Sequence, residues 1–172
     1  MNTRWKPSVT VAAVIEHEGR FLLVEEVTSD GLRLNNPAGH LEPGESLAQG
    51  CEREVLEETA HHFSPTALVG VYMARVQRAP NKPNNPDESD DVTYLRFAYC
   101  GTLGAFDPAR TLDTGIVCTV WMTPEEIRQS TARHRSPLVL QCMEDYLRGQ
   151  CYPMELVFTD DSICSTNAEM QK

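Results

Sequence analysis

Residues 39–61 read GHLEPGESLAQGCEREVLEETAH, a glycine-rich loop followed by an acidic helix. The loop spans 39–45, where two glycines and a proline interrupt regular structure. Ser46 is the expected N-cap, because Gln49 stands three residues later and the two residues can form a capping box. We therefore predict a helix from Ser46 to about Ala60.

One face of this helix changes from apolar to acidic along its length. The stripe at helical spacing consists of Leu47, Cys51, Glu54 and Glu58. Glu57 flanks its acidic end, and carboxylates this close repel each other, so the pattern indicates a divalent cation. Oxygen ligands favour Mg2+ or Mn2+ over zinc. In the alternative interpretation, residues 52–58 form a solvated face on which Arg53 pairs locally.

The loop and helix together resemble the Nudix box, Gx5Ex7REUxEExGU, where U is a bulky aliphatic residue. The positions that match in register are Gly39, Glu45, Arg53, Glu54, Val55, Glu57 and Glu58. So many matches at fixed spacing are a specific signal. Ala60 and His61 replace the glycine and the aliphatic residue of the box, beyond the acidic residues.

The resemblance implies a Mg2+-dependent enzyme, with Mn2+ as a possible substitute, and a role for each matched residue. The implied metal ligands are the carboxylates of Glu54, Glu57 and Glu58 and the backbone carbonyl of Ala38. Glu45 and Arg53 would fix the loop on the helix, with Glu45 contacting metal through water. Bound metal would bridge diphosphate oxygens and activate the attacking water.

The general base has two possible sources. Nudix enzymes often use a glutamate of the box or an acid from a later loop, so the base would be Asp113 or one of Glu54, Glu57 and Glu58. Asp113 can equally be a turn residue that caps Gly115.

A wider resemblance, over about residues 5–157, is to the bacterial phosphatase NudJ group of this family. The segments that carry it are 6–12, 36–42 and 135–139. It implies an α/β/α sandwich with a mixed sheet, and hydrolysis of nucleoside di- and triphosphates, thiamine diphosphate and hydroxymethylpyrimidine diphosphate with release of orthophosphate. The alternative is a pyrophosphohydrolase that releases pyrophosphate or a nucleoside monophosphate. A sensor that no longer hydrolyses its ligand is disfavoured, because all acids of the box are present.

Two basic residues are candidates for substrate binding. An acidic protein needs local positive charge near a bound phosphate, and His40 and Arg135 can provide it. The alternatives are a loop-packing residue for His40 and a surface residue near a helix N-cap for Arg135.

The remaining chain predicts one α/β domain over residues 1–158 and a disordered tail over 159–172. The predicted strands are 9–15, 21–24, 32–36, 67–76, 93–103 and 116–122, and two further helices start at Thr123 and Pro137. The stretch 77–92, rich in proline, asparagine and aspartate, is predicted to be a mobile loop.

The composition of the chain limits the classes of partner that we expect it to bind. The net charge of −10 argues against nucleic-acid binding, and no stretch is long and apolar enough for a membrane helix. The short apolar run near the N-terminus is followed by no small-residue cleavage site, so we expect a first strand there rather than a secretion signal. The six cysteines form no CxxC pair, which favours reduced thiols in a cytoplasmic protein. We expect a small diphosphate or nucleotide substrate and a monomer or homodimer.

Overall fold

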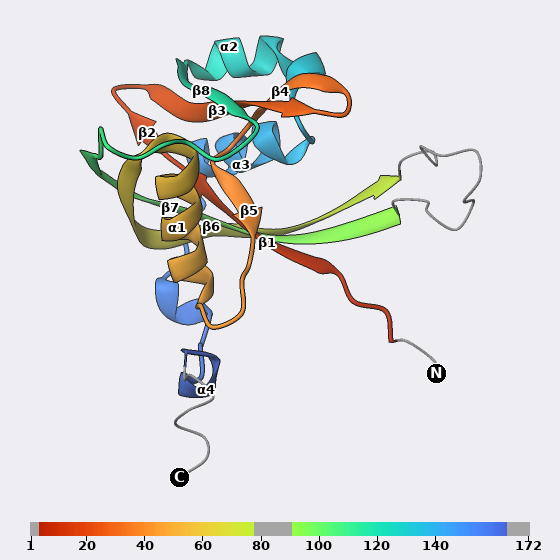
Figure 1. Ribbon diagram of the computed structural model, residues 1–172, viewed down its shortest axis with the longest axis vertical. Helices are drawn as coiled ribbons and strands as arrows, with labels where there is room; N and C mark the ends of the chain where they lie inside the picture. Colours follow the sequence, from red (N-terminus) through yellow and green to blue (C-terminus); the bar gives the residue numbers. More distant parts are fainter. Residues whose placement is uncertain (1–3, 78–90, 165–172) are drawn as a thin grey trace.

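The computed structural model describes residues 4–77 and 91–164, and two four-stranded sheets form its centre (Figure 1). In the first sheet the strand order is β5(Ala38–His40), β1(Ser8–Val14), β7(Asp91–Phe106) and β6(His61–Gln77). Strand β1 runs parallel to β7 and antiparallel to β5, and β6 pairs antiparallel with β7, so this sheet is mixed.

The second sheet is antiparallel. Its strands are β2(Glu16–His17), β3(Arg20–Thr28), β4(Gly31–Asn35) and β8(Ile116–Met122). Strand β3 pairs with the other three. The turn from β2 to β3 has positive φ at Glu18 and Gly19, as expected for a tight hairpin turn.

Helices cover both faces of the mixed sheet. Helix α1(Leu47–Thr59) covers one face and α3(Leu138–Leu147) covers the other, whereas α2(Pro124–Gln129) packs against β8 and α3. The remaining helical elements are α4(Asp161–Cys164) and the 3-10 turns η1(Thr131–Arg133) and η2(Met154–Leu156). Alternate residues of β1 enter two separate cores: Val11 and Ala13 pack in the core that contains α1, whereas Ala12 and Val14 pack in the core that contains α3. The predicted α/β/α arrangement with a mixed sheet is confirmed.

Helix α1 begins and ends as its local sequence dictates. Ser46 and Gln49 form the predicted capping box, with both reciprocal hydrogen bonds present. The helix ends at Ala60, which takes the left-handed conformation with φ 57°. This conformation favours glycine, which is the residue of the Nudix box at this position. Ala60 therefore keeps the helix exit of the box at a conformational cost of about 1–2 kcal/mol.

Several boundaries differ from the sequence prediction. Gly39 and His40, predicted to open the loop, instead belong with Ala38 to strand β5, because residues 38–40 pair with residues 10–12 of β1. Strand β6 begins at His61, not at 67, and the ladder shifts register near Pro65, where a bulge accommodates a residue without an N–H. Residues 78–90 of the predicted loop and 165–172 of the predicted tail lie outside the described residues, whereas residues 77 and 91–92 belong to β6 and β7, and 161–164 form α4 rather than a disordered segment. No helix in the described part of the chain is long and apolar enough to span a membrane.

Candidate active site

The acidic end of α1 faces inward. Glu54 and Glu58 keep only 8% of their surface exposed, and Cys51 and Val55 on the same side are fully buried. Glu57 is half-buried beside them. The interpretation of this segment as a solvated face is therefore wrong for Glu54 and Glu58.

Arg53 joins the loop to the acidic residues. Its Nε and Nη2 donate to the two carboxylate oxygens of Glu45 at 2.9 and 2.8 Å, a bidentate pair. Its Nη1 donates to Glu54 Oε1 at 2.7 Å and to Glu57 Oε2 at 2.9 Å. Nη2 also donates to the backbone oxygen of His40 at 2.9 Å. One guanidinium thus holds β5, the loop and three glutamates in fixed relative positions.

Strand β5 touches the glutamates directly. The N–H of Ala38 donates to Glu58 Oε2 at 2.8 Å. At Gly39, a Cβ atom would lie 2.2 Å from the carboxylate atoms of Glu54. The box glycine is therefore required here because the Glu54 carboxylate occupies the space of a side chain.

Burial and charge shift the pKa values of these acids in opposite directions. Burial raises the pKa of Glu58 to about 8, and it also raises the pKa of Glu54. The hydrogen bonds from Arg53 lower the pKa of Glu45. Burial thus makes ionisation of Glu54 and Glu58 less favourable than in water, and a nearby cation would counter this effect.

The donor set fits a hard cation. In residues 4–77 and 91–164, no three His, Cys, Asp or Glu side chains are grouped as in a metal site. Glu54 and Glu57 accept hydrogen bonds from Arg53, and Glu58 accepts one from the Ala38 N–H. All three acids nevertheless lie on one helix side against β5, and carboxylate oxygens are the preferred ligands of Mg2+. Glycine at position 39 leaves the room that the Glu54 carboxylate needs.

Asp113 lies at the end of α1. Its N–H donates to the backbone oxygen of Glu57 at 3.0 Å, and its own oxygen accepts from Ile116 N at 3.0 Å. Its exposed carboxylate is near enough to raise the pKa values of Glu54 and Glu58. Both interpretations of Asp113, as a base and as a turn residue before Gly115, are compatible with this position. Arg110, which the sequence analysis missed, donates to Glu57 Oε1 at 3.4 Å.

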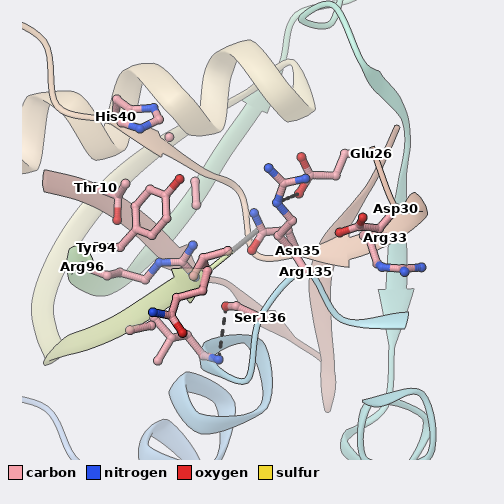
Figure 2. A pocket seen from close by; sticks show the side chains of 16 residues that line it. Thr10, Glu26, Asp30, Arg33, Asn35, His40, Tyr94, Arg96, Arg135 and Ser136 are labelled. Carbon is pink, nitrogen blue, oxygen red and sulfur yellow. Dashed lines mark hydrogen bonds and ion pairs between the residues drawn. The ribbon is translucent and has the colours of Figure 1, made fainter. Parts of the chain in front are cut away.

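A pocket of about 370 Å³ opens on the other side of β5, between the mixed sheet, β3, β4 and the start of α3 (Figure 2). Ala38 and Gly39 line it, so it adjoins the glutamates. Both predicted substrate residues, His40 and Arg135, line it as well. His40 is exposed and its ring lies 6.1 Å from that of Tyr94. The side chain of Arg135 is 33% exposed, and its Nε lies 3.9 Å from Glu26, beyond hydrogen-bond distance.

The sequence analysis missed the most buried charged group of this pocket. Arg96 of β7 is 8% exposed and lines the pocket together with Glu26, Asn35 and Thr10. A signal was present in the sequence, because Arg96 interrupts an otherwise apolar strand at a position that shares a face with Ala98.

Known proteins match this chain over most of its length. The NUDIX domain model matches residues 4–142. The phosphatase NudJ of Escherichia coli strain K12 is 37% identical over 153 residues, which cover 89% of this chain and 92% of that protein. Among solved structures, a NUDIX hydrolase from Nitrosomonas europaea is 50% identical with a TM-score of 0.80, covering 91% of this chain and 99% of that one. The Escherichia coli ORF135 protein is 25% identical with a TM-score of 0.59, covering 83% and 90% of the two chains.

The residues matched by the NUDIX domain model, 4–142, include the loop, α1 and every residue that lines the pocket. The resemblance to NudJ extends beyond the box to nearly the whole chain. The chain is therefore an enzyme that hydrolyses phosphoanhydride bonds, and it belongs to the Nudix hydrolase family, close to NudJ.

Proposed function

We propose that this Nudix hydrolase is a Mg2+-dependent phosphatase, which Mn2+ can also activate, acting on nucleoside di- and triphosphates and on thiamine-related diphosphates with release of orthophosphate. The observation that carries the proposal is the convergence of Glu54, Glu57 and Glu58 beside Ala38, at the border of a pocket lined by arginines. The name of its relative, phosphatase NudJ, supports the product.

The metal ligands in this proposal are Glu54, Glu57, Glu58 and the carbonyl of Ala38. When bound, the metal supplies charge neutralisation at the diphosphate and lowers the pKa of water. Arg53 keeps Glu45 and the loop in place through its bidentate pair and holds the other two glutamates near β5. Such positioning matters because phosphoryl transfer depends mainly on orientation and electrostatic stabilisation.

The remaining predicted residues have supporting roles in this proposal. Asp113 or one of the three helix glutamates accepts a proton from the attacking water. His40 and Arg135 contact the substrate from the pocket, on the side of β5 away from α1. The six cysteines are all unpaired, which supports a reducing, cytoplasmic compartment.

A small substrate panel tests the proposal. Thiamine diphosphate, hydroxymethylpyrimidine diphosphate, nucleoside di- and triphosphates and ADP-ribose are each incubated with the enzyme and Mg2+, and orthophosphate and pyrophosphate are both quantified. Orthophosphate from the di- and triphosphates is the expected product. Pyrophosphate or a nucleoside monophosphate as the main product would instead assign the enzyme to the pyrophosphohydrolases.

A further inference from the structure

Arg96 is a buried cation with free hydrogen-bond donors. Its residue surface is 8% exposed, and neither Nε nor Nη1 has a hydrogen-bond partner among the described residues. A buried charge without partners costs several kcal/mol, so such groups are normally paired. Arginine cannot avoid this cost by losing its proton. The protein therefore buries the charge of Arg96 without hydrogen bonds to Nε and Nη1 that would compensate the free energy of desolvation.

The guanidinium of Arg96 points into the pocket (Figure 2). Strand register explains this direction, because Arg96 is level with Thr10 of β1, which is level with His40 of β5. Side chains at one level of neighbouring strands lie on the same sheet face. The three residues thus form a row that leads from the buried Arg96 to the edge strand that contacts the glutamates.

The charges around the pocket favour an anion. Three arginines line it, Arg33, Arg96 and Arg135, against two carboxylates, Glu26 and Asp30. This local excess of positive charge contrasts with a net charge of −10 for the whole chain. Glu26 and Glu58 act on the charge of Arg96 from nearby, yet neither donates or accepts a hydrogen bond with it.

We propose that Arg96 binds the phosphoryl group of the substrate that the metal cluster does not hold, donating one of its unpaired N–H groups to a non-bridging oxygen. A hydrogen bond from a guanidinium to a phosphoryl oxygen is charge-assisted and therefore stronger than one between neutral groups. Arg135 adds positive charge at the mouth of the pocket. The location of this group on the substrate rests on the proposed function, because it assumes that metal holds the other phosphoryl group beside Glu58.

A neutral ligand explains the pocket less well. The carbonyl oxygens of a pyrimidine ring can accept hydrogen bonds from Arg96, but they leave its charge uncompensated in a buried position. A phosphoryl group both accepts a hydrogen bond from Arg96 and compensates its charge. The substrate class is therefore a compound with a free phosphoryl group next to the metal-bound one, as in a diphosphate monoester or a nucleoside triphosphate.

The test measures anion binding without metal and without turnover. The melting temperature of the full chain is recorded in EDTA with increasing inorganic phosphate, against potassium chloride of equal ionic strength. At ten times the dissociation constant, phosphate should raise the melting temperature of the wild type by about 3–6 °C. Arg96→Met should remove this rise, and Arg96→Lys should reduce it.

Two comparisons make the result specific. Arg20→Met, which replaces an exposed arginine of β3 that pairs with Glu126 of α2, should keep the full rise. Without phosphate, Arg96→Met should melt at the same temperature as the wild type or higher, because it removes an unpaired buried charge. If Arg96→Met melts much lower, Arg96 is structural and the proposal is overturned. It is also overturned if Arg96→Met and the wild type show equal phosphate-dependent rises, or if uridine gives the same Arg96-dependent rise as phosphate.

Enzyme kinetics separate this proposal from the proposed function. Glu57→Gln should lose turnover but keep the rise in EDTA, whereas Arg96→Met should lose the rise and show KM for a diphosphate raised at least about tenfold. Normal turnover in Glu57→Gln would refute the metal cluster and leave phosphate binding by Arg96 standing. A normal KM in Arg96→Met, with hydrolysis intact, would refute only the role of Arg96.

Discussion

Gly39→Ala tests whether the Glu54 carboxylate occupies the space left by the missing side chain. An added Cβ would lie 2.2 Å from the Cδ and both oxygens of Glu54, whereas ordinary contact begins at 3.4 Å. The carboxylate must therefore retreat by at least about 1.2 Å. It is the end of a flexible side chain, so the fold can accommodate the change while the position of the acid is lost.

The expected loss of stability and activity follows from the contacts that Glu54 would lose when its carboxylate moves. Glu54 would leave its 2.7 Å hydrogen bond with Arg53, and overpacking of this kind costs about 1–3 kcal/mol of stability. Displacing a catalytic group by about 1 Å costs roughly a hundredfold in rate. We therefore expect kcat/KM to fall about a hundredfold while the protein remains folded.

A double-mutant cycle isolates the cause. Urea unfolding in EDTA gives the free energy of unfolding for the wild type, Gly39→Ala, Glu54→Ala and the double variant. The three atoms nearest to the added Cβ all belong to the Glu54 carboxylate, so Gly39→Ala should cost less than about 0.5 kcal/mol in the Glu54→Ala background. An equal cost in both backgrounds would show that glycine is needed for another reason, and the explanation given for position 39 would be wrong.

Three further predictions concern the acids and the metal. Glu57→Gln should lower kcat by orders of magnitude in saturating Mg2+ while the melting temperature stays near normal. The control Glu52→Gln, on the exposed side of α1, should retain activity. Normal turnover in Glu57→Gln would contradict the assignment of Glu57 as a metal ligand. EDTA should abolish hydrolysis and Mg2+ or Mn2+ should restore it, so activity that survives thorough chelation would count against the metal. Burial lowers the pKa of His134 below 6.5, so the folded protein favours the neutral form of this side chain. The stability that the neutral side chain contributes is therefore fully present above pH 6.5 and is lost as the pH falls through the lowered pKa. The fall in melting temperature between pH 7.5 and 5.5 should be smaller in His134→Gln, and an unchanged fall would assign it to other groups.

Local sequence rules were sufficient for the helix that carries the acids. The capping box at Ser46 and the spacing of Glu54 and Glu58 depend on neighbours along the chain, and both predictions are confirmed by the hydrogen bonds and the burial. The resemblance to the Nudix box located the glutamates and Arg53 before any geometry was known. It did so because the box lies on one continuous segment of 39–61.

Features that depend on pairing between segments distant in the sequence were not predicted from the sequence. Strand β5 is short and contains a glycine, so only its pairing with β1 identifies it as a strand. Arg96 is far from the box in sequence and belongs to the site only because β7 runs parallel beside β1. The pocket likewise combines residues from both sheets and from the start of α3, an arrangement that no single segment encodes.

Arg53 explains how such an acidic site can fold before metal binds. Burial alone disfavours ionised Glu54, and Glu57 and Asp113 add repulsion. The guanidinium offsets this by binding Glu45, Glu54 and Glu57 at once, and its pairing with Glu45 leaves it anchored to the loop if the other two acids turn away. A cation that takes over Glu54 and Glu57 therefore need not displace Arg53, because the bidentate pair with Glu45 keeps the loop and β5 in place.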